Sequence, residues 1–305
     1  MSGKMSSLLK QIISSYPHPE KVKIKDITKV GKMIDSLVSR GPESLQVITD
    51  FDFTLSKSHL PDGSPACSGP GVMNNSSLMS QDFRDKVNAL YKKYRPIEFD
   101  HNMPVEQKIP LMVEWYQQRK NVVVASRVQR SQIEEMVTSC GVVLRDGAPK
   151  TLAWLNEEKV PVLIFSAGNG DIIEAVMKRD GVMFDNAHVI ANFYKYDDEG
   201  FVIDYKNSTL LHVFNKNEHA IENSTYFEDI SHRPNALLLG DHLADARMAE
   251  GMQDPETIFK IGFFNDPSQV EESLSLYEET FDVVLVEDQT FEFVNILLKF
   301  IFGRN

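Results

Sequence analysis

The chain has 305 residues, which is enough for one large domain or for a core with a smaller second domain. Hydrophobic residues make up 42% of the chain and charged residues 25%, as in ordinary folded globular proteins. The formal net charge of -12 argues against binding to a nucleic-acid polymer, because contacts with a phosphate backbone need a positive face. A small anionic substrate remains possible if its pocket is locally positive.

The stretch from Met1 to Pro17 lacks the apolar core and cleavage pattern of a secretory signal. No run approaches the roughly 20 apolar residues that a membrane-spanning helix needs. The two cysteines, Cys67 and Cys140, are therefore expected to be free thiols in a reducing compartment. We expect a cytoplasmic monomer that has no membrane partner.

The first strong strand pattern is the apolar run Leu45–Thr49, and it leads directly into Asp50 and Asp52. Open α/β sheets bind ligands at the carboxyl ends of their strands, so this acidic pair stands where a site is expected. One Asp can attack phosphorus, and the other can protonate the leaving oxygen and later activate water. Mg2+ would screen their repulsion with a phosphate. Solvated turns and calcium loops also contain such pairs, and this stretch alone is equally compatible with them.

A long insertion follows this acidic motif. About 110 residues separate it from the next apolar run that ends in polar residues, far more than an ordinary βα connection holds. The interval begins with a loop rich in proline and glycine and continues with helical patterns, which indicates a helical cap over the site. The expected cap helices are Gln81–Lys93, Pro104–Arg119 and Ser131–Ser139.

The rest of the chain alternates between strand and helix patterns, which predicts a mostly parallel sheet with helices on both faces. Asp198-Glu199-Gly200 predicts a hairpin outside that sheet. We expect a catalytic core at residues 44–60 and 146–305, a cap at 61–145, and an N-terminal helical segment at 1–43 that packs with the cap. The expected strands are Val160–Phe165, His188–Asn192, Ala236–Leu239, Ile258–Phe263 and Asp282–Val286, and the expected helices are Asp171–Lys178, Ala244–Ala249 and Thr290–Phe300.

Two later strand patterns also end in polar residues. Ser166, followed by Ala167 and Gly168, could donate hydrogen bonds to phosphate oxygens, or could simply cap a strand-to-helix turn. Asp241 follows a buried run, and Asp245 stands one turn later in the expected helix. The alternative, a pair of acids favoured by a helix dipole, suits Asp245 better than Asp241.

The order of these motifs resembles that of haloacid dehalogenase-type phosphatases, with Lys216 as the lysine motif. The resemblance implies a Rossmann-like α/β core with an inserted helical cap. It makes Asp50 the nucleophile and a Mg2+ ligand, and Asp52 the general acid/base with a coordinating carbonyl. Ser166, Ala167, Gly168 and Lys216 would bind the phosphate. Asp241 would be a direct Mg2+ ligand and Asp245 a water-mediated one.

Longer segments resemble the type III cytosolic 5′-nucleotidases, among them Pro96 to Glu98, Met112 to Tyr116 and His212 to Asn217. This resemblance implies Mg2+-dependent hydrolysis of CMP and UMP or of 7-methyl-GMP through an aspartyl-phosphate, with phosphotransfer as a side activity. Glu98 would bind the base, and Trp115 would line or stack on it. The alternatives are a solvated helix-end acid for Glu98 and a core residue for Trp115.

The chain departs from that family at three places. His242 and Ala244 stand where members usually have Ser and Gly, and the loop 69–72 lacks the usual base-stacking aromatic residue or histidine. Residues 117–120 replace a stretch that usually contains serine. Two other functions therefore remain: a phosphatase of another small phosphomonoester, and a catalytically silent binding protein.

Overall fold

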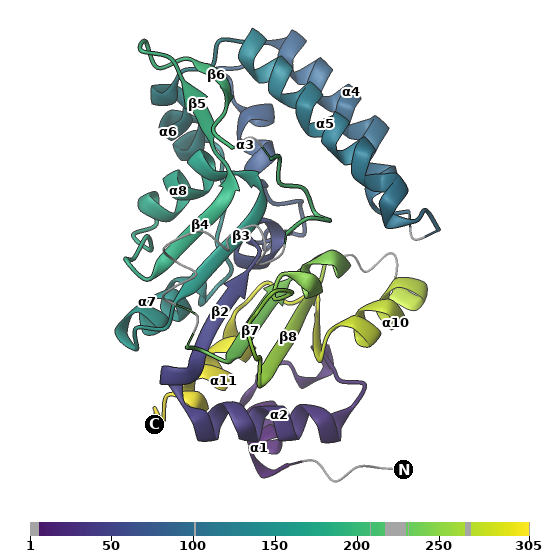
Figure 1. Cartoon of the computed structure of the whole chain (residues 1–305), viewed down its shortest axis with the longest axis vertical. Coiled ribbons are helices and arrows are strands. Elements are labelled where there is room, and N and C mark those ends of the chain that lie inside the picture. Colours follow the sequence, from purple (N-terminus) through teal and green to yellow (C-terminus); the bar gives the residue numbers. More distant parts are fainter. Residues whose placement is uncertain are drawn as a thin grey trace.

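A seven-stranded sheet forms the centre of the computed structural model, which describes residues 6–100, 102–207, 209–216, 230, 232–265 and 270–304. The strand order is β1-β9-β8-β7-β2-β3-β4, and the strands from β8 to β4 are labelled in Figure 1. All neighbouring pairs are parallel except β1 with β9. The strands are β1 (Val22–Lys23), β2 (Leu45–Thr49), β3 (Val162–Asn169), β4 (Ala187–Asn192), β7 (Asn235–Gly240), β8 (Thr257–Phe264) and β9 (Val283–Val286).

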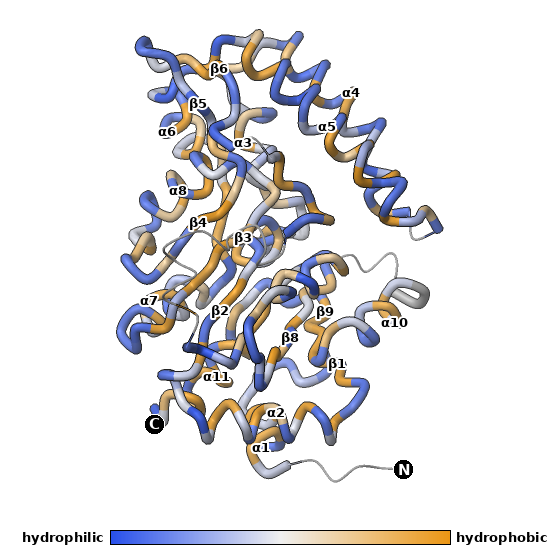
Figure 2. Tube along the Cα trace, in the orientation of Figure 1, coloured by the Kyte–Doolittle hydropathy of each residue, from blue (hydrophilic) through white to orange (hydrophobic). Residues whose placement is uncertain are grey.

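The central strands are buried on both faces. Within β2, Val47 packs into one apolar cluster and Ile48 into the cluster on the opposite face, as the alternation of side chains in a strand requires. Figure 2 shows these strands as a hydrophobic centre. The expected parallel α/β architecture is therefore confirmed. The helices are α1 (Ser7–Ser15), α2 (Ile27–Arg40), α3 (Gly69–Asn75), α4 (Gln81–Glu98), α5 (Val105–Ala125), α6 (Arg130–Ser139), α7 (Ala148–Glu157), α8 (Gly170–Arg179), α10 (Val270–Thr280) and α11 (Glu292–Ile301).

The N-terminal helices pack on the core, so the prediction that they pack with the cap is wrong. α1 and α2 contact each other and α11, and α2 also contacts β8. β1 adds an antiparallel strand beside β9, with Val22 opposite Leu285. The helix pattern marks an apolar face, including the buried Ile12 and Ile34, but it does not specify which surface covers that face.

The cap lies to one side of the sheet, where α4 and α5 run as a long pair (Figure 1). Both helices extend past their predicted ends. α4 continues beyond Pro96 because a proline so near the C-terminus disturbs only the last turn. The predicted hairpin is confirmed as β5 (Tyr194–Tyr196) and β6 (Val202–Tyr205), and β6 contacts α5.

The turn after β7 also differs from the sequence-based expectation. A helix was expected at Ala244–Ala249, whereas the structure has a short 3-10 helix at Leu243–Arg247. Side chains cause this tighter turn, because His242 Nδ1 accepts a hydrogen bond from Ala244 N and Asp245 accepts from His242 N.

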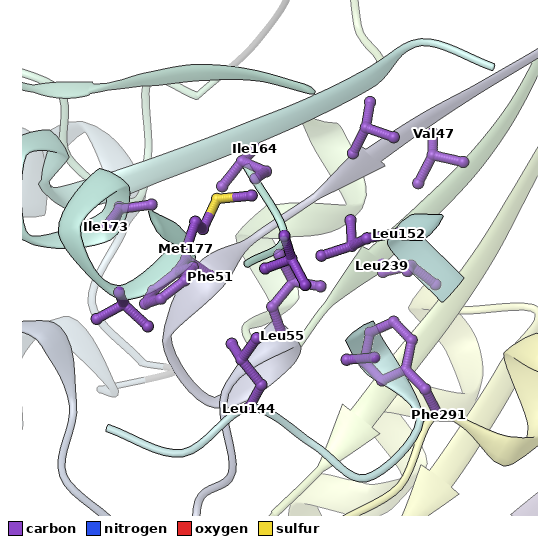
Figure 3. Close-up of a cluster of buried hydrophobic side chains, with 14 of the residues drawn as sticks. Val47, Phe51, Leu55, Leu144, Leu152, Ile164, Ile173, Met177, Leu239 and Phe291 are labelled. Carbon is purple, nitrogen blue, oxygen red and sulfur yellow. The ribbon is translucent and has the colours of Figure 1, made fainter. Parts of the chain in front are cut away.

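An apolar cluster supports the loop that follows β2. Phe51 and Leu55 of this loop are buried in the cluster together with Ile164 of β3 and Leu239 of β7 (Figure 3). The acidic residues of the loop are thereby anchored to the sheet on either side. Within the described residues, no helix is both long enough and apolar enough to cross a lipid bilayer.

Candidate active site

Asp50 lies at the carboxyl end of β2, between β3 and β7. Its backbone N–H donates to Leu239 O at 3.0 Å, so its position follows directly from the register of the sheet. The chain leaves β2 toward the cap, and the strands that return lie on both sides of it. Such a reversal of strand order opens the crevice in which α/β sheets bind ligands.

Three carboxylates and one lysine meet at this point. Lys216 Nζ lies 2.8 Å from Asp50 Oδ1 and 2.6 Å from Asp245 Oδ1. Carboxylate oxygens of Asp50, Asp241 and Asp245 lie within 4.8 Å of one another. The structure thus brings together four predicted residues from three separate stretches of the sequence; Asn217 of the lysine motif lies outside the described residues.

Burial and mutual repulsion dominate the electrostatics of this cluster. Burial, with a contribution from Asp245, raises the pKa of Asp50 to about 7 although Lys216 opposes the shift. Burial and the charges of Asp50 and Asp245 raise the pKa of Asp241 well above its usual range. Burial alone would lower the pKa of Lys216, but Asp245 and Asp50 outweigh it and keep this lysine charged. One lysine therefore faces more negative charge than it can neutralise.

Asp52 joins the core to the cap loop. Its Oδ1 accepts a hydrogen bond of 2.5 Å from Gly69 N, at the start of α3. The backbone of Gly168 also approaches closely, since a Cβ at this glycine would lie 3.3 Å from Asp52 Oδ2. Burial raises the pKa of Asp52, with Gly69 opposing the shift. A raised pKa suits a residue that must donate a proton.

The turn after β3 contains Ser166, Ala167 and Gly168. Ser166 is buried, and its Oγ accepts from Gly168 N at 3.0 Å. Asn192 Nδ2 donates to Ala167 O at 2.9 Å and holds the turn from β4. The segment is therefore held by hydrogen bonds and lies beside Asp52.

The turn after β7 positions the second acidic motif. Asp245 Oδ2 accepts from the backbone N–H groups of Asp241, at 3.2 Å, and His242, at 3.0 Å. A Cβ at Gly240 would lie 2.3 Å from Asp245 Cβ, so only glycine fits there. Thr54 Oγ1 donates to Asp241 Oδ1 at 3.4 Å and links the two acidic loops.

Arg145 is a supporting residue that the sequence did not reveal. It is completely buried and donates to Thr54 O at 2.8 Å, to Phe53 O at 2.6 Å and to Asp288 O. These bonds hold the loop in which Phe53 adopts a left-handed φ of 61°. Arg145 stands in no motif and is one of 32 lysines and arginines, so no sequence signal distinguished it.

A cavity of about 270 Å³ lies between the core and the cap. Lys216 and His242 line it from the core, and Glu98 lines it from α4. The Glu98 side chain is buried and pairs with Arg95, 2.6 Å apart, so it is not a solvated helix-end acid. The other lining residues are Met103, Val105, Lys108, Val213, Phe214, Leu243, Ala244, Arg247 and Glu250.

Trp115 is half-buried among cap aromatic residues and, in the described part of the chain, is not one of the residues lining this cavity. Its ring stacks on Tyr94 with centroids 5.8 Å apart and an interplanar angle of 14°. This packing matches the alternative expectation of a structural residue.

The fold is one that haloacid dehalogenase-family hydrolases have. A haloacid dehalogenase-family hydrolase from Salmonella enterica has the same fold, with a TM-score of 0.54 at 12% identity over 86% of this chain and 73% of that one. The model of the family described as pyrimidine 5′-nucleotidase (UMPH-1) matches residues 53–302. The chain belongs to this family and is a 5′-nucleotidase, a phosphomonoester hydrolase.

Several relatives are similar over nearly their whole length. The 7-methylguanosine phosphate-specific 5′-nucleotidase A of Xenopus laevis is 36% identical over 93% of this chain and 97% of its own. The human 7-methylguanosine phosphate-specific 5′-nucleotidase is 37% identical over 90% of both chains. A crystal structure of cytosolic 5′-nucleotidase IIIB bound to cytidine has a TM-score of 0.89, 32% identity and 99% coverage of both chains.

Proposed function

We propose that this protein is a Mg2+-dependent, cytoplasmic 5′-nucleotidase that hydrolyses CMP and UMP or 7-methyl-GMP through an aspartyl-phosphate. The observation that carries the proposal is the cluster of Asp50, Asp241, Asp245 and Lys216, of which Lys216 also lines the cavity that Glu98 lines from the cap. Lys216, which the proposal assigns to the phosphate, and Glu98, which it assigns to the base, therefore share one cavity.

The chain's own residues can carry both half-reactions. Asp50 attacks phosphorus while Asp52 gives its proton to the leaving 5′ oxygen of the nucleoside. Asp52, now ionised, then takes a proton from the water that attacks the aspartyl-phosphate and releases inorganic phosphate. Lys216 and the 166–168 turn bind the phosphate oxygens throughout, so positioning and charge neutralisation supply most of the catalysis. An alcohol of another nucleoside could replace the water, which would give the phosphotransferase side activity.

The acidic cluster fits Mg2+. Its donors are carboxylate oxygens, which this ion prefers, and the described residues supply no cysteine or histidine to the group of three. A buried surplus of negative charge is costly, and a divalent cation would remove it. Asp50 and Asp241 would hold the ion, with Asp245 nearby and held by Lys216 and backbone amides. Bound Mg2+ would supply charge neutralisation for the phosphate and the attacking carboxylate.

The choice of base is the open part of the proposal. The relatives from Xenopus laevis and human are named for 7-methylguanosine phosphate, whereas the family is named for pyrimidine nucleotides. The crystal structure of cytosolic 5′-nucleotidase IIIB has cytidine bound. Cytosine and 7-methylguanine both carry an exocyclic amine, and a carboxylate such as Glu98 accepts from such a group. Trp115 would contribute to the base site only if its ring leaves its stack on Tyr94.

A panel of phosphate-release measurements tests the activity. CMP, UMP, GMP, 7-methyl-GMP and methyl phosphate would each be compared with Mg2+ and with EDTA. We expect hydrolysis of one or more of the named nucleotides well above that of methyl phosphate, and loss of activity with EDTA. Equal rates on methyl phosphate and the nucleotides would instead favour a general small-molecule phosphatase.

Replacing Glu98 tests base recognition. Glu98→Ala should weaken transition-state binding of amine-bearing nucleotides by about 1.5–3 kcal/mol, the worth of a hydrogen bond to a charged group. The matched control is Glu114→Ala on α5, because Glu114 is half-exposed and pairs with Lys93 rather than lining the cavity. If kcat/KM falls equally for nucleotides and for methyl phosphate, Glu98 does not bind the base.

A further inference from the structure

We propose that His242 is a specificity residue whose Nε2–H donates a hydrogen bond to a ribose hydroxyl of the substrate. This inference rests on the proposed nucleotidase function and assigns its sugar contact. It concerns a residue that stands directly after Asp241 and lines the cavity together with Lys216 and Glu98.

The orientation and tautomer of the ring follow from its hydrogen bond. Ala244 N donates to His242 Nδ1 at 3.1 Å, so Nδ1 is an acceptor and carries no proton. A neutral imidazole then carries its single proton on Nε2. Across the described residues, the His242 ring has no second hydrogen-bond partner, which leaves Nε2–H available to a ligand in the cavity that this residue lines.

Two aromatic side chains hold the ring in place. Phe99 of the cap meets it edge to face, with centroids 5.1 Å apart and an interplanar angle of 88°. Phe214 contacts it from the core at 6.0 Å. The guanidinium of Arg95 lies 4.0 Å from the centre of the Phe99 ring and also pairs with Glu98. The imidazole therefore belongs to the same packed set as the base-binding carboxylate.

The position of His242 favours a contact with the sugar of the substrate rather than with its phosphate or its base. The proposal assigns the phosphate to Asp50 and Lys216 and the base to Glu98. The ribose joins these two groups in every nucleoside monophosphate, so it must lie between them in the cavity that Lys216, His242 and Glu98 all line. A hydroxyl oxygen accepts readily from a neutral N–H donor.

The test pairs two variants with substrates that lack one hydroxyl. His242→Asn keeps an oxygen close to the position of Nδ1 that can still accept from Ala244 N, but it has no donor at the position of Nε2. His242→Gln extends an amide N–H to about the position of Nε2. The substrates are CMP, 2′-deoxy-CMP, 3′-deoxy-CMP and methyl phosphate, all measured as kcat/KM with Mg2+.

For the wild type, removing the contacted hydroxyl should lower kcat/KM by roughly two- to tenfold, the range of a neutral hydrogen bond. His242→Asn should lower kcat/KM for CMP by the same factor, in addition to any decrease it causes for methyl phosphate. For the variant, removing the contacted hydroxyl from the substrate should then cause no further decrease. His242→Gln should restore part of the discrimination between CMP and its deoxy form. Calorimetric binding of cytidine and the two deoxycytidines gives the same comparison without turnover, and applies even where a variant is inactive.

Two outcomes would overturn the assignment. If neither deoxy substrate is discriminated by the wild type, or if the variant loses equal factors on CMP, deoxy-CMP and methyl phosphate, His242 does not contact the sugar. The proposed function fails separately: a protein that hydrolyses methyl phosphate as efficiently as CMP, UMP and 7-methyl-GMP would overturn both claims. A protein that prefers CMP, but in which His242→Asn has no selective effect, would overturn only the role of His242.

Discussion

At the scale of single residues, the active site concentrates negative charge where the sheet excludes water. Asp50, Asp241 and Asp245 face one another within 4.8 Å, and Lys216 offsets only part of their charge. Such an arrangement lowers the stability of the folded chain unless a proton or a cation joins it. In the proposed mechanism, the same burial leaves the Asp50 carboxylate poorly solvated and therefore more reactive toward phosphorus.

Asp50→Asn separates these two effects. The variant should lose turnover by orders of magnitude, because an amide cannot form the aspartyl-phosphate. In EDTA it should melt at a higher temperature than the wild type, by about 2 °C or more at neutral pH, since one buried charge is removed. Thermal denaturation with EDTA, beside a phosphate-release assay, measures both. A lower melting temperature would show that the Lys216 pair outweighs the repulsion.

The pH dependence of that difference has a definite sign. The pKa of Asp50 is raised from its usual value of 3.8 to about 7, so its contribution to stability is present below about pH 4. It is lost as the pH rises through about 7. Metal-free wild type should therefore lose stability relative to Asp50→Asn between pH 4 and pH 7, and the difference should level off above that range.

Binding of Mg2+ should follow the same titration. The ion needs ionised carboxylates, so it must displace the proton that Asp50 holds near pH 7. The apparent affinity for Mg2+ should increase from pH 6 to pH 8, with protons released at the lower pH. Calorimetry in two buffers of different ionisation enthalpy measures both quantities. An affinity that is equal at pH 6 and pH 8 would contradict the raised pKa.

At the scale of elements, the catalytic loop is held by contacts from distant parts of the chain. Arg145, just before α7, donates to the carbonyl groups of Phe53 and Thr54 and also reaches Asn265 after β8 at 2.8 Å. Its guanidinium is buried over the ring of Phe263, 4.3 Å from the ring centre. Because Phe53 occupies a left-handed conformation, the loop needs this support to keep Asp50 and Asp52 at the sheet edge.

Arg145→Met should destabilise the fold strongly. It leaves several buried carbonyl oxygens without donors, which should cost about 3 kcal/mol or more of the free energy of unfolding. Urea denaturation measures this loss, and kcat should fall as well, since the loop carries the catalytic acids. Arg40→Met is the matched control, because Arg40 is half-exposed in a surface pair with Glu256. Equal effects of the two changes would show that Arg145 does not support the loop.

At the scale of the whole molecule, the N-terminal helices belong to the stability of the core. Ile12 of α1 is fully buried in the same apolar cluster as α2, α11 and one face of the sheet. Tyr16, which follows α1, donates to Asp288 at 2.6 Å, and Asp288 in turn accepts from Arg145 through its carbonyl. The N-terminus is thus connected to the loop of the active site by two hydrogen-bonded residues.

Ile12→Ala should lower the free energy of unfolding by about 2–5 kcal/mol through the cavity it creates. KM for the nucleotide should change little, because α1 packs on the core helices rather than on the cap. Ile13→Ala offers a control, since Ile13 is only partly buried. A large rise in KM together with unchanged stability would instead indicate that α1 contacts the cap, which is what the sequence predicted.

The sequence by itself determined most of the strands, the cap helices and the order of the motifs. β2 is found at its predicted residues, and the other predicted core strands begin and end within a few residues of their predicted ends, except that β3 continues to Asn169; β1 was not predicted. Apolar runs and the polar residues that end them are local patterns, so they can be recognised in the sequence without knowledge of the tertiary structure. The motif resemblance then predicted which acids converge, and the structure brings Asp50, Asp241, Asp245 and Lys216 together.

Only the tertiary structure decided where amphipathic faces and isolated charges go. A helix with one apolar face can cover the core or the cap with equal local energy, so the placement of α1 and α2 depended on the exposed edge at β9 and the surface beside α11. The role of Arg145 and the stacking of Trp115 likewise arise from neighbours distant in the chain. Such contacts are determined by packing, and the packing energy depends on all the neighbouring side chains together. They therefore produce no periodic pattern in the sequence.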